Sequence, residues 1–190
     1  MKTFGIALKI FLLFTLLTGV IYPLLVTGIA QVVFPHQANG SLIIKDNKII
    51  GSELIGQQSD SIIYFTSRPS AIGNNPLPSG GSNYGLTNKK LKDQFTERKN
   101  KFIAFNQLDK DVVVPSEMLF ASASGLDPHI SPEAARLQIN RIVKARNFSL
   151  VQKQKLKTLV EEISEAPQLT FLGESRVNVL LLNIALDQIK

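Results

Sequence analysis

The sequence predicts one N-terminal transmembrane helix followed by a single α+β domain. Three observations support this fold class. An uninterrupted apolar run lies near the N-terminus, short apolar stretches broken by turn residues follow it, and helical periodicities with clear caps fill the second half. The residues after the anchor, 35–190, are numerous enough to bury roughly two-thirds of the surface that their unfolded chain exposes.

The expected transmembrane helix covers residues 10–34. From Ile10 to Phe34 the chain has 25 residues without a formal charge, whereas about 20 suffice to cross a hydrocarbon core roughly 30 Å thick. Gly28 and Ala30 also form an acceptable signal-peptide cleavage pattern. However, the apolar run before them exceeds the usual length of about 7 to 15 residues in a signal sequence. We therefore expect a retained anchor.

The basic residues around this helix predict its orientation. Lys2 and Lys9 lie on its N-terminal side, and the first basic residue after it is Lys45. Because Lys and Arg are enriched on the cytoplasmic side of membrane helices, we expect residues 1–9 to be cytoplasmic. Residues 35–190 then form an extracytoplasmic domain on the outer side of the cytoplasmic membrane.

Three residues interrupt the otherwise bulky anchor. Gly19 and Gly28 leave small notches on the helix surface, and Pro23 removes one helical hydrogen bond. Small residues allow close approach of a second helix, and a neighbouring helix can supply the lost bond. We interpret the three as a packing surface for a partner subunit. An ordinary lipid anchor containing helix-breaking residues is the alternative.

The first part of the domain predicts strands and a long loop. Leu42–Ile44 and Ile49–Gly51 flank Asp46-Asn47, a pattern typical of a β-hairpin. Ile62–Phe65 is a further candidate strand. Arg68–Asn88 is rich in Pro, Gly, Ser and Asn, which predicts a loop, and loops of this length tend to be functional or disordered.

The run from Asn88 to Lys101 predicts a basic helix. Asn88 is a suitable N-cap, and the apolar positions recur at helical spacing at Leu91, Phe95, Phe102 and Phe105. Lysine and arginine dominate the rest of this run, and the whole chain has a formal net charge of +6. A solvated helix face explains such a run better than a surface for nucleic acid or anionic lipid, so we expect no nucleic-acid partner.

Two further helices follow. Ser131 is a suitable N-cap with Pro132 in the first helical position, and the apolar face consists of Ala135, Ile139, Ile142 and Val143. Ser149 and Gln152 match a capping box for the next helix, which Pro167 ends. The apolar tail from Val177 to Ile189 predicts a buried strand or a buried helix.

The residue inventory restricts the chemistry. Cysteine is absent and the only histidines are His36 and His129, so neither a metal constellation nor a bound cofactor is predicted. Ser122, Ser124, Asp127 and His129 contain the residue types of a serine hydrolase, but no nucleophile-elbow pattern surrounds either serine. A turn leading into the next helix explains this segment better, and we predict no catalytic residue.

One glycine-rich element, Pro78–Asn83, could present backbone N–H groups to an anion or a partner. A flexible surface turn is the simpler interpretation. No Walker A lysine pattern and no strand-linked GxGxxG accompany it, so the sequence does not predict nucleotide hydrolysis by this chain alone.

A set of short motifs, taken in order, resembles one known family. The anchor has Thr18-Gly19 and Tyr22-Pro23-Leu24-Leu25, and Gln37-Ala38-Asn39-Gly40-Ser41-Leu42 follows it. The domain has Leu54-Ile55-Gly56-Gln57, Tyr64-Phe65, Arg68-Pro69-Ser70-Ala71, Ser79-Gly80-Gly81-Ser82-Asn83, Ala121-Ser122-Ala123-Ser124-Gly125-Leu126-Asp127, Lys144-Ala145-Arg146-Asn147, Val177-Asn178-Val179 and Ala185-Leu186-Asp187. By their order and spacing, the chain resembles KdpC, the C subunit of the Kdp-type potassium-transporting ATPase.

The resemblance implies a non-catalytic accessory subunit of a high-affinity, ATP-driven potassium uptake complex, needed for assembly and activity. The implied partners are a channel-like potassium subunit, a P-type ATPase subunit and membrane lipid, and the complex handles ATP and K⁺. The family is described as a catalytic chaperone that raises the ATP affinity of the ATPase subunit. Its proposed nucleotide contact maps onto Ser79, Gly80, Gly81, Ser82 and Asn83.

The predicted orientation conflicts with this nucleotide contact, because an outer domain does not meet cytoplasmic ATP. A role at the outer mouth of the K⁺ pathway fits the charge bias better. Two other functions remain open: a membrane-anchored extracytoplasmic hydrolase using Ser124 and His129, and a generic anchored binding protein.

Overall fold

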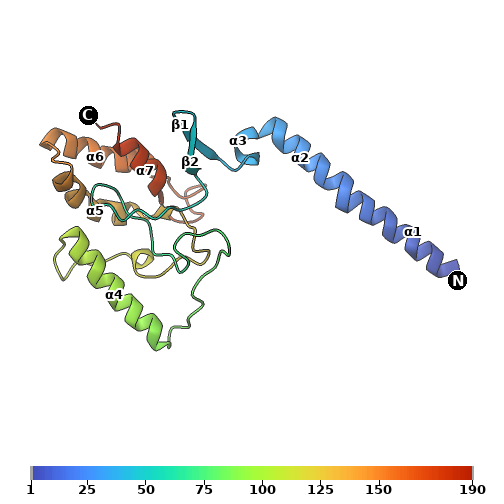
Figure 1. The fold of residues 1–190 in the computed structure, drawn as a ribbon, viewed down its shortest axis with the longest axis horizontal. Coiled ribbons are helices and arrows are strands. Elements are labelled where there is room, and N and C mark those ends of the chain that lie inside the picture. Colours follow the sequence, from blue (N-terminus) through green and yellow to red (C-terminus); the bar gives the residue numbers. More distant parts are fainter. Residues whose placement is uncertain (1, 190) are drawn as a thin grey trace. The chain divides into compact units, whose positions relative to one another are not determined.

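The computed structural model describes residues 2–189 (Figure 1). The chain divides between Ile50 and Gly51 into two compact units, which are described separately. The first contains a long apolar helix and most of a β-hairpin. The second combines helices with short strands. The predicted fold class, one N-terminal apolar helix followed by an α+β domain, is confirmed.

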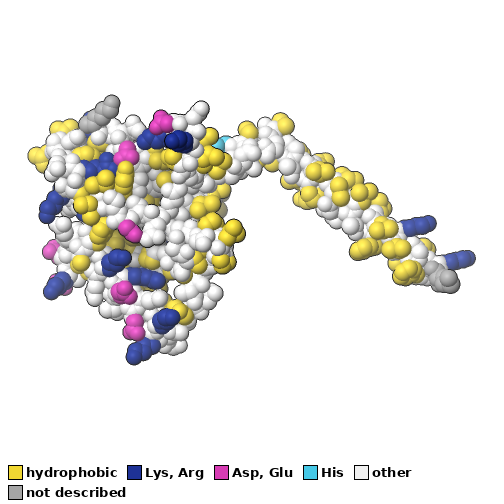
Figure 2. All heavy atoms as spheres, in the orientation of Figure 1, with side chains coloured by type: hydrophobic (Ala, Val, Ile, Leu, Met, Phe, Trp, Pro, Cys, Tyr) yellow, Lys and Arg dark blue, Asp and Glu magenta, His cyan; other side chains and the backbone are white. Residues whose placement is uncertain are grey.

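The N-terminal helix consists of α1 (Lys2–Leu16), the π-helical turn η1 (Leu17–Ile21) and α2 (Tyr22–Val33). Together they form one helix of 32 residues with a mean hydropathy of 2.3, long and apolar enough to cross a membrane. Figure 2 shows hydrophobic side chains along this helix, with Lys or Arg side chains only toward its N-terminal end. The helix thus begins at Lys2, eight residues before the expected span of residues 10–34, and ends at Val33, one residue before the end of that span.

A short helix and a hairpin follow the long helix. The short helix is α3 (Pro35–Ala38), and strands β1 (Leu42–Lys45) and β2 (Lys48–Ser52) form a two-stranded sheet. Asp46 and Asn47 join the strands with φ angles of 51° and 60°. Positive φ at both turn residues is typical of a type I′ hairpin turn, and the predicted hairpin is confirmed.

The second unit contains the helices α4 (Lys89–Asn106), α5 (Pro132–Ala145), α6 (Leu150–Ile163) and α7 (Val179–Leu186), with the short 3₁₀ turn η2 (Ser116–Met118). The predicted caps are confirmed. Asn88 and Ser131 each accept a hydrogen bond from a backbone N–H of the first turn, and Ser149 forms the capping box with Gln152. Local side-chain chemistry therefore fixes where α4, α5 and α6 begin.

The core of the second unit forms around α5. This helix lies between α4 and α6, and α6 also packs against α7. Side chains from all four helices and from the loops fill the space between them: Phe65, Phe102, Met118, Ile130, Ala135, Ile139, Ile142, Leu156, Val160, Val177, Leu182 and Leu186. Three of the four residues of the predicted α5 apolar face, Ala135, Ile139 and Ile142, belong to this core.

The C-terminal tail contains both predicted alternatives. Strand β4 (Val177–Asn178) pairs antiparallel with β3 (His129–Ile130), with His129 opposite Asn178. The Asn178 side chain then accepts the N–H groups of Leu180 and Leu181 and so caps α7. The tail is therefore a short strand that leads directly into a buried helix.

The candidate strand at Ile62–Phe65 is wrong. This segment has no neighbouring strand, and its backbone groups instead bond to side chains from α5, α7 and the residue after α5. Buried backbone groups must find partners, and here polar side chains supply them. The segment therefore belongs to a long loop, residues 53–88, that contains no helix or strand.

Candidate functional site: a loop cluster fixed by side chains

Arg141, a buried cation on α5 that is 4% exposed, holds part of the loop formed by residues 53–88. Its guanidinium group donates to the carbonyl oxygens of Ile62 and Tyr64 and to the side-chain oxygen of Asn106. The group also stacks 4.5 Å from the ring centre of Phe105. Burial lowers the pKa of Arg141 to about 10, so it stays charged at neutral pH.

Three more side chains continue this clasp. Gln138, fully buried on α5, accepts the backbone N–H of Thr66 at 2.8 Å. Asn183 of α7 both accepts the N–H of Phe65 and donates to its carbonyl. Arg146 donates to the carbonyl of Ile63 and pairs with Asp187 at 2.8 Å. Together with Arg141, these side chains bond to the backbone of residues 62–66, as a neighbouring strand would otherwise do.

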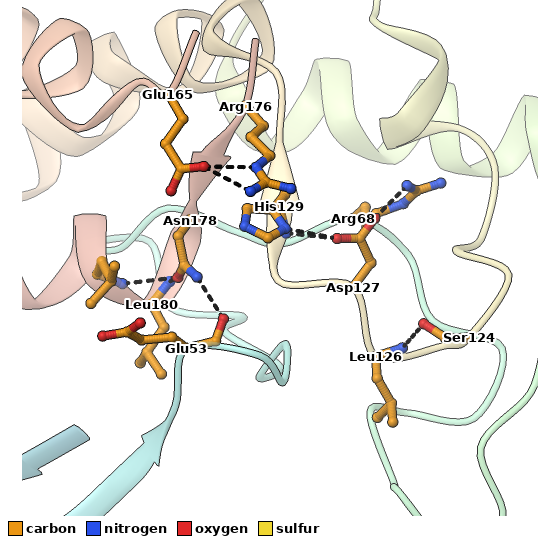
Figure 3. A network of polar contacts seen from close by, with 11 residues as sticks. Glu53, Arg68, Ser124, Leu126, Asp127, His129, Glu165, Arg176, Asn178 and Leu180 are labelled. Atoms are coloured by element: carbon orange, nitrogen blue, oxygen red, sulfur yellow. Dashed lines mark hydrogen bonds and ion pairs between the residues drawn. The ribbon is translucent and has the colours of Figure 1, made fainter. Parts of the chain in front are cut away.

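A second polar centre lies around Asp127 (Figure 3). Arg68 donates to one carboxylate oxygen at 2.8 Å, and the backbone N–H of His129 donates to the other at 3.0 Å. The His129 ring nitrogen Nδ1 lies 3.3 Å from this second oxygen. Burial alone would raise the pKa of Asp127, but the contacts with His129 and Arg68 outweigh it and lower the pKa to about 2. Asp127 is therefore a carboxylate at neutral pH.

Backbone contacts connect the loop to residues 122–126. The N–H of Gly56 donates to the carbonyl of Leu126 at 2.7 Å, and the N–H of Ser122 donates to the carbonyl of Pro69 at 3.0 Å. The hydroxyl of Ser70 donates to the carbonyl of Gly125 at 2.7 Å. Segments far apart in the sequence thus form one loop cluster, comprising residues 54–57, 68–71, 79–83 and 121–129.

The predicted nucleotide segment, Ser79–Asn83, belongs to this cluster. The N–H of Gly80 donates to the carbonyl of Ser124 at 2.9 Å, so this amide is already occupied. A Cβ on Gly81 would lie 2.9 Å from the carbonyl oxygen of Ala123, which explains why glycine fits there. Ser79 and Asn83 are exposed. Nucleotide binding by these five residues stays a prediction.

A groove of about 740 Å³ borders the Asp127 centre. Its polar lining includes Arg68, Glu117, Asp127, His129 and Arg176. Arg68 and Asp127 pair with each other, and Glu117 accepts the N–H of Ser131. Arg176 pairs with Glu165 at 2.8 Å (Figure 3). Most charges that line the groove are therefore already paired within the domain.

An apolar finger, defined as residues 165–176, forms another wall of this groove. Two antiparallel bridges join its two sides, Glu165 with Arg176 at the base and Gln168 with Leu172 next to the tip. Leu169 and Thr170 at the tip have φ angles of 51° and 70°, which are uncommon for residues with these side chains. Leu169 and Phe171 are each 74% exposed. The finger thus presents large apolar side chains on a closed hairpin-like scaffold.

The three predicted packing residues lie in the long helix. Gly19 is in the η1 turn, and Pro23 and Gly28 are in α2. Among the described residues, no atom outside the local helix lies within 4 Å of a Cβ built on either glycine. Nine residues make about two and a half turns of a regular α-helix, so such a helix would place the two notches on opposite sides. Their packing role stays a prediction.

The hydrolase alternative gains no support from the geometry. The hydroxyl of Ser124 accepts the backbone N–H of Leu126 at 3.1 Å, whereas His129 contacts Asp127. Figure 3 shows these as two separate contacts, one between Ser124 and Leu126 and one between His129 and Asp127. Ser122 is buried. The serine and histidine are therefore not arranged as nucleophile and general base.

The structure also bears on metal binding. Within residues 2–189, no group of three or more His, Cys, Asp or Glu side chains is arranged to hold a metal ion. His36 belongs to α3 in the first unit and His129 to β3 in the second. The polar side chains described above bond to other side chains and to backbone groups of the same domain.

Sequence reasoning did not anticipate the clasp on α5. Gln138 and Arg141 lie among the apolar residues of the buried face, where the periodicity of α5 offered a signal. A polar residue at a core position of a helix needs buried partners. The identity of these partners, carbonyl groups about 80 residues earlier, has no local sequence pattern.

The comparisons with known proteins agree with one another. The family described as "KdpC: K+-transporting ATPase, c chain" matches residues 4–188. The chain belongs to the KdpC family. A KdpC subunit from Photorhabdus laumondii is 46% identical over 188 residues, covering 97% of this chain and 94% of that protein.

Two further KdpC subunits show the same extent of similarity. The protein from Pectobacterium atrosepticum is 47% identical and that from Mycobacterium tuberculosis H37Rv is 45% identical. They cover 97% and 96% of this chain, and 95% and 96% of their own lengths. All three are named as KdpC subunits of potassium-transporting ATPases. The resemblance identified in the sequence is confirmed, and this KdpC-family chain is an accessory subunit of a potassium-transporting ATPase.

Proposed function

We propose that this chain is a non-catalytic subunit that a high-affinity potassium-transporting ATPase needs for assembly and activity, and that it acts from the outer side of the cytoplasmic membrane. The observation that carries the proposal is the combination of a nearly full-length KdpC match with one long apolar helix. The partners are the channel-like potassium subunit and the P-type ATPase subunit of the complex. ATP and K⁺ are handled by these partners.

The geometry supports a docking role for the domain. The side chains of the loop cluster and the α5 clasp bond mainly within the domain, although the buried Nε of Arg68 has no partner among the described residues. These contacts hold many separate segments in one arrangement. The apolar finger, in contrast, exposes Leu169 and Phe171. Neighbouring exposed apolar side chains, unlike single scattered ones, are a feature of protein contact surfaces. We infer that the finger contacts a partner subunit.

The same proposal accounts for the family's described effect on ATP affinity without a direct nucleotide contact. An accessory domain can alter ATP affinity if it binds one conformation of the complex more tightly than another. The alternative is direct contact through Ser79–Asn83, which requires the domain to face the cytoplasm. The positions of Lys2 and Lys9 favour the outer side.

Purification from membranes tests the assembly role. The full-length chain, tagged after Lys190 and extracted in mild detergent, should co-purify with two much larger hydrophobic subunits. Cells lacking the chain should lose growth at low external potassium, and the restored chain should rescue it. Purification of the chain alone, together with normal growth of the deletion strain, would overturn the proposal.

Substitution within the glycine-rich segment separates the two routes to ATP affinity. The Ser79→Ala and Asn83→Ala variants change exposed side chains and should leave the KM for ATP of the assembled complex unchanged. A rise in KM for ATP with intact assembly would support nucleotide contact instead. Loss of assembly in either variant would identify the segment as a subunit contact.

A further inference from the structure

The π-helical turn η1 leaves two adjacent carbonyl groups without their usual donors. In an α-helix each carbonyl accepts the N–H of the residue four positions later. The N–H of Tyr22 instead donates to Leu17, five positions back, so the carbonyl of Thr18 loses its normal donor. The carbonyl of Gly19 loses its own, because Pro23 has no N–H.

These two carbonyls lie beside an open notch. Gly19 has no side chain, and among the described residues nothing outside the local helix lies within 4 Å of where its Cβ would be. The hydroxyl of Thr18 donates its only proton to the carbonyl of Phe14 at 2.7 Å, so it is not available to them. The side of the helix at Gly19 is therefore open to the approach of a group from outside the chain.

The position of these carbonyls within the membrane requires a hydrogen-bond donor from outside the chain. Residues 17–21 occupy the middle of the helix Lys2–Val33, which corresponds to the centre of the hydrocarbon core if the helix spans the membrane. Water is scarce there, and an unsatisfied backbone carbonyl costs several kcal/mol. A proline and a π turn in a lipid-facing helix are stable when a neighbouring helix supplies the missing donors.

We propose that the η1 turn is a docking site for a transmembrane helix of another subunit, which places a hydroxyl, amide or indole donor against the carbonyls of Thr18 and Gly19. Gly19 provides the close approach, and Pro23 keeps the acceptors free. The inference rests on the proposed function, because the ATPase complex provides the neighbouring helix. It adds the chemistry of the contact, a side-chain donor meeting backbone acceptors.

The sequence allows a direct test by solid-state NMR. Gly19-Val20 is the only Gly-Val pair in the chain, so ¹³C-carbonyl glycine combined with ¹⁵N valine reports the Gly19 carbonyl alone. The full chain is measured in lipid vesicles by itself and after assembly with unlabelled partner subunits. The Gly19 carbonyl resonance should move to higher chemical shift on assembly, as hydrogen bonding to a carbonyl causes.

A matched pair of variants supports the assignment. Pro23→Ala restores an N–H for Gly19, so its resonance should lie at the bonded position even without partners. Retention of this variant in the complex should fall by about threefold to tenfold, the range expected for one interhelical hydrogen bond. Leu24→Ala removes bulk beside the turn without restoring a donor and should keep the assembly-dependent change in shift.

The outcomes separate this inference from the proposed function. Failure of the wild-type chain to associate with partner subunits would overturn the proposed function. Association with an unchanged Gly19 resonance would overturn only the docking inference. A resonance that responds to the amount of chain in the vesicle, or to exchange into heavy water, and not to the partners would assign the acceptors to a second copy or to water, and would also overturn it.

Discussion

Arg141 has an unusual role for a buried cation. Its partners are carbonyl and amide oxygens and the ring of Phe105. A planar group with five N–H donors suits this task, because it meets several acceptors in one plane. The charged group thus holds a loop backbone in position, and its hydrogen bonds offset the free-energy cost of burying it.

Replacing Arg141 by Met should therefore strongly destabilise the domain. The change leaves the carbonyls of Ile62 and Tyr64 without donors, and breaking such a buried network typically costs about 3 to 5 kcal/mol. Urea unfolding of residues 35–190, followed by circular dichroism, measures it. The control is Arg136→Met, because Arg136 and its partner Glu161 are about half exposed and such pairs contribute roughly 0 to 1 kcal/mol. Equal effects of the two changes would contradict the role assigned to Arg141.

Asp127 predicts a pH dependence with a definite sign. Its pKa in the folded domain is about 2, below the ordinary value of 3.8. The carboxylate therefore stabilises the fold above about pH 4, and this contribution is lost as the pH falls from about 4 to 2. The difference corresponds to about 2 kcal/mol before allowance for solvent screening.

The Asp127→Asn variant tests this sign. It should be less stable than the wild type by about 1 to 2 kcal/mol at neutral pH, because the ion pair with Arg68 is lost. The gap in unfolding free energy between the two proteins should close between pH 4 and pH 2. A gap that stays constant over this range would show that Asp127 does not titrate as described.

At the scale of elements, the sequence predicted what depends on neighbours along the chain. Asn88, Ser131 and the Ser149–Gln152 pair marked the helix starts, because capping joins residues within one turn. The Asp46-Asn47 hairpin was equally local. Ile62–Phe65 was predicted wrongly because its apolar composition fits a strand, whereas its backbone partners lie on helices far along the chain.

The capping box offers a measurable contribution to α6. Ser149→Ala removes the acceptor for the N–H of Gln152 and should lower stability by about 1 kcal/mol, as is typical for an N-cap. Thr158→Ala, on the exposed side of the same helix, should have no destabilising effect, because alanine has the higher helix propensity. Comparable destabilisation by both would exclude a specific cap effect.

The long helix carries a prediction of its own. Gly28→Leu or Gly19→Leu keeps the helix hydrophobic enough to insert but fills a notch that close helix packing needs. Each variant should reach the membrane, fail to co-purify with the larger subunits and lose potassium uptake. Leu12→Ile and Leu16→Ile, which alter neither length nor notch, should assemble normally. Normal assembly of the glycine variants would make the helix a simple tether.

At the scale of the whole molecule, the family could be identified from the order of short motifs, whereas their spatial relation could not. Gly56, Pro69, Gly80 and Ser122 lie in separate motifs, yet all contribute to one loop cluster. Such contacts join segments up to about 70 residues apart. They depend on the complete tertiary structure, so no local pattern predicts them.

The central claim is that the domain works from the outer side of the membrane, and the absence of cysteine makes this directly measurable. The exposed Ser79 is replaced by cysteine in the full-length chain, and sealed right-side-out membrane vesicles are treated with a membrane-impermeant maleimide. A Lys2→Cys chain serves as the control for the opposite side. The account predicts labelling of the Ser79→Cys chain in sealed vesicles and of the Lys2→Cys chain only after permeabilisation. The reverse pattern would place the domain in the cytoplasm and contradict the account.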